Sequence, residues 1–423
     1  MFTPLNRRRF IVSGIAAAIA SPAVRAQAAG PRVVVVGGGF GGAACARALR
    51  KADPRITVTL VEANRTYTAS PMSNAVIAGL RDLSQQQFGY DKIAHDGIAV
   101  ALSAATAIDP HARSVMLADG TKLAYDRLVL SPGIDFRWGA IAGYDEAAAA
   151  LMPHAYKGAD QIALLRRQLE SMEDGGLVAI SAPVNPARCP PAPYERASLI
   201  AYHLKRNKPR SKIVILDAKD SFAMHELFQD AWKALYPGLI EWVPVGSSGL
   251  VTSVDPKTRT LSTDFDNYKA AVANVIPPQK AGHAAELAGV ADRTGWCPVN
   301  PITFQSMLDS NVHVIGDAAI AGAMPRAASA AQVQAKICAD AIVAFFAGKM
   351  PWAPTLTSSC FSLIAPHYAI SQHGTFRPVK DQQYEESPPG IVVSPRNAAP
   401  AVRSGEAKEA NAWFAEITAA VFG

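Results

Sequence analysis

The chain has 423 residues, of which 49% are hydrophobic and 18% are charged, so it can bury large cores and should fold into two or three domains. Four basic and no acidic residues lie in the first 26 positions, which leaves 37 of the 41 basic residues against 35 acidic ones. This near balance of charge argues against a protein that binds nucleic acid, because such proteins need a large excess of basic residues.

The first 26 residues carry the pattern of an export signal. Arg7 and Arg8 are paired, Phe10 follows, and an apolar run of about 14 residues leads to small residues around positions 24–26. The pattern predicts a twin-arginine signal and a periplasmic mature protein. A membrane anchor is the alternative, but it needs about 20 apolar residues. No later segment has an uninterrupted apolar run of that kind, so we expect no integral membrane segment in the mature chain.

The cysteines limit the redox chemistry of the chain. None belongs to a C-x-x-C or C-x-x-C-H motif, so the sequence predicts neither a thioredoxin-type site nor a covalently attached haem on this chain. Export to an oxidising compartment permits disulfides. The five cysteines are Cys45, Cys189, Cys297, Cys338 and Cys360.

Residues 31–64 predict a strand, a glycine turn, a helix and a second strand. The glycines follow the pattern G-x-G-x-x-G, and Glu62 ends the second strand, where its carboxylate can accept from a ribose hydroxyl. Glycine lets a backbone approach a pyrophosphate, and the free N–H groups of the next helix can bind it. We therefore predict a dinucleotide site. Its residues are Gly37, Gly39, Phe40, Gly42, Glu62 and Ala63, while Cys45 should be a packed apolar residue of the helix.

Residues 311–349 indicate which dinucleotide binds. A short strand, Gly316-Asp317 and a long alanine-rich helix resemble the second flavin contact of flavoproteins with two dinucleotide domains. The resemblance implies that Asp317 holds the ribityl chain, that Gly133 forms a turn toward the flavin, and that Ala105 makes a backbone contact to adenine. The cofactor it implies is FAD.

A second unit of the same kind, residues 175–222, keeps its strand, helix and strand but has lost its glycine turn. Residues 182–193 contain five prolines and no glycine. Proline has no N–H to offer a pyrophosphate, and without glycine the backbone cannot close on one. We therefore predict that no NAD(P)H binds there.

Four segments, "RCPPAPYERA", "GWCPV", "HVIGDA" and "SSCFSLIAPHYAIS", resemble the flavoprotein subunit of flavocytochrome c sulfide dehydrogenase, and the likeness runs over nearly all of the mature chain. The resemblance implies an α/β fold with two Rossmann-type domains and a C-terminal α+β domain beside the flavin, which would meet a c-type cytochrome subunit. The predicted domains are 1–26 (signal), 30–150 with 275–345 (FAD), 151–274 (second Rossmann unit) and 346–423 (C-terminal).

The same resemblance implies the chemistry. Cys189 and Cys360 would form a redox disulfide at the flavin, hydrosulfide would attack one of its sulfurs, and the electrons would pass through FAD to a haem. Glu195 matches a family glutamate and is the candidate acid or base, the alternative being a solvated carboxylate in the first turn of a helix. Ser70 stands where some members attach FAD through a cysteine, which predicts non-covalent FAD. Cys297 and Cys338 have no matched partner and should be structural.

Two other functions fit the sequence. A sulfide:quinone oxidoreductase shares the two-cysteine chemistry but needs a membrane-facing amphipathic element; residues 409–423 are apolar at helical spacing, yet no basic cluster flanks them, so they should pack on the protein body. A non-catalytic flavoprotein that maintains a sulfur-oxidising partner by thiol exchange is the other alternative.

Overall fold

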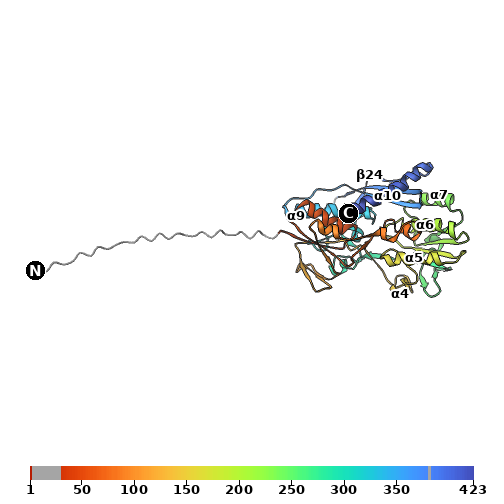
Figure 1. Cartoon of the computed structure of the whole chain (residues 1–423), viewed down its shortest axis with the longest axis horizontal. Helices are drawn as coiled ribbons and strands as arrows, with labels where there is room; N and C mark the ends of the chain where they lie inside the picture. The colour runs from red at the N-terminus through yellow and green to blue at the C-terminus, as the bar shows by residue number, and fades with distance from the viewer. Residues whose placement is uncertain (2–29, 380–382) are drawn as a thin grey trace. The chain divides into compact units, whose positions relative to one another are not determined.

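The computed structural model describes Met1 and residues 30–379 and 383–423. The predicted export signal, with Arg7, Arg8 and Phe10, lies outside the described residues. The described residues from Pro31 to Gly423 form one compact unit, drawn in colour in Figure 1.

A five-stranded parallel sheet forms the first half of this unit. Residues 33–36, all valine, are buried, as the central strand of a parallel sheet with both faces covered requires. The first strand leads through helix α1 (Phe40–Ala52) into the second, and α1 packs against the long helix α9 (Ala328–Phe346). The strands in spatial order are β20 (Val312–Val314), β9 (Arg127–Leu130), β1 (Arg32–Val36), β2 (Thr57–Glu62) and β5 (Ala99–Leu102).

Small elements complete this half. They are the antiparallel strands β6 (Ala105–Asp109), β7 (Ser114–Leu117) and β8 (Lys122–Ala124), the pair β3 (Tyr67–Thr68) and β4 (Gln87–Phe88), the pair β19 (Cys297–Pro298) and β21 (Ala319–Ile320), the short helices α2 (Ser73–Ile77), α3 (Asp91–His95) and α8 (Ala284–Leu287), and the 3-10 turns η1 (Leu83–Gln86) and η3 (Gly316–Ala318).

The second half repeats the strand–helix–strand plan around a four-stranded parallel sheet. Its helices α5 (Ala159–Ser171), α6 (Ala192–Asn207) and α7 (His225–Leu235) are grouped together in Figure 1, apart from α9. The sheet order is β13 (Ile240–Val243), β12 (Lys212–Asp217), β11 (Leu177–Ala182) and β17 (Val272–Val275). Also in this half are α4 (Glu146–Ala149), η2 (Val245–Ser247) and the antiparallel strands β14 (Ser253–Asp255), β15 (Thr260–Ser262) and β16 (Asn267–Lys269).

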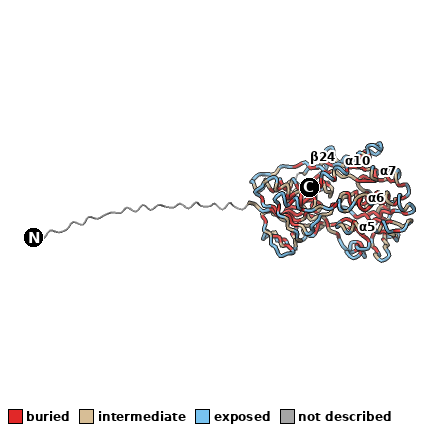
Figure 2. The backbone as a smooth tube through the Cα atoms, in the orientation of Figure 1, coloured by how far each residue is buried: buried red, intermediate tan, exposed pale blue. Residues whose placement is uncertain are grey.

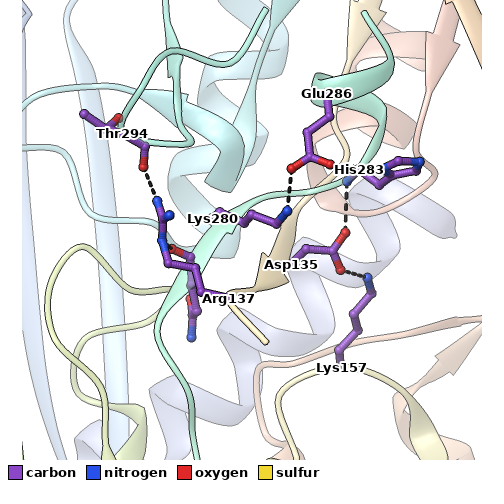
Figure 3. A network of polar contacts seen from close by, with 8 residues as sticks. Asp135, Arg137, Lys157, Lys280, His283, Glu286 and Thr294 are labelled. Atoms are coloured by element: carbon purple, nitrogen blue, oxygen red, sulfur yellow. Dashed lines mark hydrogen bonds and ion pairs between the residues drawn. The ribbon is translucent and has the colours of Figure 1, made fainter. Parts of the chain in front are cut away.

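The two connections between the halves pair with each other. Strand β10 (Ile134–Phe136) leaves the first half and lies antiparallel to β18 (Gln279–Ala281), which returns to it. Asp135 accepts hydrogen bonds from Lys157 Nζ at 2.5 Å and from the His283 N–H at 2.9 Å (Figure 3). Lys280 pairs with Glu286 beside them. These contacts fix the crossing point, and Lys157 also lines the cavity described below.

The C-terminal part adds a three-stranded antiparallel sheet and the helix α10 (Pro400–Phe422), whose apolar residues pack on the protein body as predicted. In Figure 2 the buried positions lie inside both halves and the exposed ones outside. No described helix is both long and apolar enough to span a bilayer. The strands are β22 (Leu356–Ala365), β23 (Tyr368–Pro378) and β24 (Tyr384–Val393).

Phe422 fastens α10 to the first half. Its side chain is 4% exposed, and its ring centroid lies 5.5 Å from that of Phe40, 5.3 Å from Tyr67 and 5.1 Å from Phe88. Because truncation would leave a cavity among three aromatic rings, we expect Phe422→Ala to lower the free energy of unfolding by about 3–5 kcal/mol in urea titrations. Val402→Ala on an exposed part of the same helix should change it by less than about 0.5 kcal/mol, and equal effects of the two changes would contradict this account.

Candidate active site

A cavity of about 750 Å³ lies where the first half, the second half and the C-terminal sheet meet. It is large enough for an extended cofactor and a small substrate. Gly42, Ala63 and Ala105 do not line it, although all three were predicted to bind the cofactor. The predicted residues that line it are Gly37, Gly39, Phe40, Glu62, Gly133, Cys189, Glu195, Gly316, Asp317 and Cys360.

The glycine turn at one end of the cavity has no room for side chains. Gly37 has φ +101°, and a Cβ there would lie 2.3 Å from the Ser131 carbonyl oxygen. A Cβ on Gly42 would lie 1.8 Å from the Gly37 carbonyl oxygen, so Gly42 allows the helix to pack on the turn rather than touching a ligand. The Glu62 carboxylate accepts from the Gly38 N–H at 2.8 Å, which aligns the end of β2 with the turn.

Asp317 also lines the cavity, next to Gly316 at φ +74°. Burial raises the pKa of the Asp317 carboxyl, while Arg188 and Arg326 act against that rise. Among the described residues, none donates a hydrogen bond to this carboxylate, although it lines the cavity. A half-buried acceptor without a donor fits a ligand that brings hydroxyl groups, as a ribityl chain does.

These features fit FAD. The turn offers backbone N–H groups to a pyrophosphate, Glu62 could accept from a ribose hydroxyl, and Asp317 could accept from the ribityl chain. Ser70 also lines the cavity, where its hydroxyl cannot supply the thioether of a covalent link.

The proline loop before α6 presents Cys189 to the cavity. The Arg188 N–H donates to Gln279 Oε1 at 2.8 Å, and the Cys189 N–H donates to the Arg326 carbonyl at 2.7 Å. Cys189 has φ +50°, in the left-handed region that residues with a Cβ rarely occupy, which is typical of residues held for function. The loop therefore holds the thiol in one place just before the N-terminus of α6.

Strand β22 presents Cys360 from the C-terminal sheet. Three other elements hold this strand. Ser329 at the start of α9 donates to the Ser359 carbonyl at 2.8 Å, Tyr236 donates to the Ile364 carbonyl at 2.7 Å, and Glu195 accepts from the Leu363 N–H at 2.9 Å. The strand is fixed on both sides of its cysteine.

The fold brings Cys189 and Cys360 into contact, as the predicted pairing requires. In this structure both residues are free thiols. A hydrogen bond with Cys360 and then burial raise the pKa of the Cys189 thiol well above its ordinary value, while Arg188 acts to lower it. The disulfide between them stays a prediction. Only docking of the C-terminal sheet on the second half could join positions so distant in sequence.

Glu195 is buried, which makes the alternative of a solvated carboxylate wrong. It is 9% exposed, and it accepts from Asn74 Nδ2 at 2.7 Å as well as from Leu363. Burial raises its pKa to about 6, against the effect of these two hydrogen bonds and of Arg196. A carboxyl group that titrates near neutral pH can take up or release a proton under working conditions.

The second half differs from the first at the end of its second strand. Asp217 ends β12, in the position that Glu62 has at the end of β2. It is completely buried and accepts from Tyr194 at 2.5 Å, Trp242 at 2.9 Å and Lys219 at 2.6 Å. The carboxylate that would bind a ribose is thus engaged by the protein itself. Sequence analysis missed this role, although the position at the strand end was a usable signal.

The other cysteines differ from the prediction in one respect. Cys338 on α9, expected to have no partner, hydrogen-bonds with Cys45 on α1, and burial raises the pKa of the Cys338 thiol. Both are completely buried where the two helices pack together. Cys297 in β19 is also completely buried, and this burial raises the pKa of its thiol to about 12. None of the three lines the cavity.

Asn74 and Trp413 are among the residues of the cavity wall that were not predicted. Asn74 in α2 contacts Glu195, and Trp413 of α10 lies with its ring centroid 5.8 Å from that of Phe361. The amphipathic spacing of α10 placed Trp413 on a buried face, but no local pattern indicated which cavity that face would close.

Comparison with known proteins agrees with this geometry. Residues 162–277 match the central part of the sulfide dehydrogenase [flavocytochrome c] flavoprotein chain, and residues 352–422 match the flavocytochrome c sulphide dehydrogenase flavin-binding family. Residues 31–167 match the pyridine nucleotide-disulphide oxidoreductases. A stretch of 45 residues is 64% identical to the sulfide dehydrogenase [flavocytochrome c] flavoprotein chain of Chlorobaculum thiosulfatiphilum and covers 94% of that sequence and 11% of this chain.

The chain belongs to the flavocytochrome c sulfide dehydrogenase flavoprotein family. It is also 23% identical over 297 residues to the mitochondrial sulfide:quinone oxidoreductase of Mus musculus, a match that covers 67% of this chain and spans 65% of that protein. The solved structure of the sulfide:quinone oxidoreductase from Aquifex aeolicus superposes with a TM-score of 0.73 at 17% identity, covering 93% of this chain and 92% of that one. This likeness confirms the predicted α/β fold.

The raised pKa of Glu195 predicts a pH dependence of stability. Its folded pKa of about 6 exceeds the ordinary 4.5, so the folded state binds the proton more tightly and loses stability as pH rises through this interval. We expect the free energy of unfolding of Glu195→Gln, minus that of wild type, to rise by about 2 kcal/mol from pH 4 to pH 7 in urea titrations. The exposed control Glu409→Gln should show a flat difference, and a flat difference for Glu195→Gln would refute the assignment.

Proposed function

We propose that this chain is the FAD-dependent flavoprotein subunit of a periplasmic sulfide dehydrogenase that passes electrons to a c-type cytochrome. The observation that carries the proposal is the meeting of Cys189 and Cys360 in the cavity that holds the glycine turn and Asp317. Family membership supports the flavin and the sulfur substrate.

The pair would react as a disulfide. Hydrosulfide attacks one of its sulfurs, the Cys–S–S–Cys bond breaks, and the products are a persulfide (Cys–S–SH) on one cysteine and a thiolate on the other. Restoring the disulfide then requires the removal of two electrons and the release of the outer persulfide sulfur at the zero oxidation level together with its proton (Cys–S–SH + Cys–S⁻ → Cys–S–S–Cys + S⁰ + H⁺ + 2 e⁻). Bound FAD supplies the two-electron acceptor and can release electrons singly to a haem on another chain.

Residues beside the pair would assist this exchange. Arg188 carries a positive charge that favours the Cys189 thiolate, so it stabilises this residue both as leaving group and as nucleophile. Glu195, with its pKa near neutrality, is placed to exchange the proton that distinguishes hydrogen sulfide from hydrosulfide. These roles agree with the predicted catalytic set of Cys189, Cys360 and Glu195.

The FAD should be bound without a covalent link, because Ser70 lines the cavity where a cysteine would be needed. Precipitation of the purified protein with acid should therefore release all of the flavin into the supernatant. The measurement is the flavin absorbance of the two fractions. Yellow colour that stays with the denatured protein would contradict this proposal.

We propose further that the chain does not use NAD(P)H. The proline loop lacks the glycines of a pyrophosphate turn, and Asp217 is engaged by Tyr194, Lys219 and Trp242.

The periplasmic location rests on the paired Arg7 and Arg8, and N-terminal sequencing of the protein from each cell fraction would test it. An unprocessed N-terminus on protein that remains in the cytoplasmic fraction would contradict it.

A sulfide:quinone oxidoreductase is the second candidate, since proteins of that name resemble the chain in sequence and fold. Against it, α10 turns its apolar residues Phe414, Ile417 and Phe422 into the protein body. Steady-state sulfide oxidation with a c-type cytochrome or with a soluble quinone as acceptor separates the two. Faster turnover with the quinone, and flotation of the protein with liposomes, would favour the second candidate.

The cysteine pair gives the decisive test. Replacing Cys189 or Cys360 with serine removes the sulfur that hydrosulfide attacks, so anaerobic sulfide should reduce the flavin at least about 100-fold more slowly in both variants. Flavin content should stay near that of wild type. The measurement is flavin absorbance in stopped flow, with Cys297→Ala, away from the cavity, as a control that keeps the normal rate.

Two outcomes of this experiment would overturn the assignment. A Cys360→Ser protein that oxidises sulfide at the normal rate would remove the pair from the mechanism and favour the non-catalytic, thiol-exchanging flavoprotein. Rapid reduction of the wild-type flavin by NADH in place of sulfide would instead indicate a nicotinamide-dependent reductase.

A further inference from the structure

Asn74 lies where the first half of the chain contacts the start of α6. It lies in the short helix α2 of the first half and is 4% exposed. Its Nδ2 group donates to Glu195 Oε2 at 2.7 Å and to the Ala192 carbonyl at 3.2 Å, and its Oδ1 accepts from Arg196 Nε at 3.0 Å. All three hydrogen bonds of this amide go to the start of α6, the helix that follows Cys189.

Glu195 connects that contact to the other cysteine. Its second oxygen, Oε1, accepts from the Leu363 N–H at 2.9 Å, in the strand that carries Cys360 three positions earlier. The carboxylate therefore has one oxygen on Asn74 and the other on β22. A change in its orientation would release the strand on the side of the cysteine pair.

Asn74 also separates two buried charges. The Arg196 guanidinium is 2% exposed and donates to the carbonyls of His154 and Ala155 and to Asn274 Oδ1, at 2.7–2.9 Å. In the described part of the chain it forms no ion pair with Glu195, because the Asn74 amide lies between them, accepting from one and donating to the other. A carboxylate at this position could accept from Arg196 but could not donate to Glu195.

We propose that Asn74 is a positioning residue for the cysteine pair: its amide holds the Glu195 carboxylate in the orientation that binds the Leu363 N–H, and so keeps the strand of Cys360 against the loop of Cys189. The proposal rests on the proposed function of that pair. Asn74 acts through Glu195 and needs no contact with substrate.

The charges around Glu195 decide what a substitution would do. Arg196 on α6 favours its ionised form, whereas Cys189 on the proline loop and Tyr156 ahead of α5 add negative charge when they ionise; α2 carries no titratable side chain. Asn74→Asp would remove a hydrogen-bond donor from Glu195 and add a like charge beside it. Both changes favour the protonated carboxyl.

Asn74→Asp is therefore the test variant. We expect the pH midpoint that Glu195 gives to the unfolding free energy to rise by about 1 pH unit or more, and the Leu363 amide to exchange with deuterium at least about 10-fold faster. The same replacement at Asn207, on the exposed end of α6, is the matched control and should change neither quantity. Asn74→Ser, which shortens the side chain without adding charge, should give the same increase in Leu363 exchange and serves if the first variant does not fold.

A double-mutant cycle separates positioning from general destabilisation. If Asn74 acts through Glu195, Asn74→Asp should slow sulfide-dependent flavin reduction in wild type by about 10-fold or more and have little further effect in Glu195→Gln. Additive effects, or Leu363 exchange and pH midpoint unchanged in Asn74→Asp, would overturn the proposal. Failure of wild type to react with sulfide would refute the proposed function instead. The role of Asn74 would then still be tested by comparing deuterium exchange of the Leu363 amide in Asn74→Asp and in wild type.

Discussion

The contact between the proline loop and strand β22 is the constraint on which the rest of the structure depends. Cys189 and Cys360 can meet only if the C-terminal sheet docks on the second half, and that docking must be reproducible to within the length of a disulfide. Hydrogen bonds from several parts of the chain stabilise this docking. Gln279 and Arg326 accept from N–H groups of the proline loop, and Ser329 and Tyr236 donate to carbonyl groups of β22. The site therefore belongs to no single domain. It exists only in the assembled unit.

Local parts of this arrangement could be predicted from sequence, because their causes are local. The valine strand, the close-packed glycines and Glu62 lie within one strand–helix–strand segment, where spacing determines geometry. The loss of a nucleotide turn was equally visible, since prolines exclude it without reference to the rest of the chain. The pairing of Cys189 with Cys360 came from resemblance, because no spacing rule links residues that meet only through tertiary structure.

The residues that sequence analysis missed are those whose partners lie far away in the chain. No pattern within its own helix indicates a role for Asn74. That role follows from its hydrogen bonds with Glu195 and Arg196 in the other half of the unit. Cys338 likewise gained its partner, Cys45, from the packing of two helices rich in small residues. Glu195 was misjudged in one alternative for a related reason: the first turn of a helix is usually exposed, and here another strand covers it.

The position of α10 in the sequence also sets an order of events during synthesis. The glycine turn and Glu62 are made early, yet Trp413 closes the cavity and Phe422 packs on Phe40 only after the last helix has been made and has docked. A nascent chain therefore offers the cofactor an open surface with one wall missing. Firm retention of the flavin therefore requires a docked α10, because Trp413 forms part of the cavity wall.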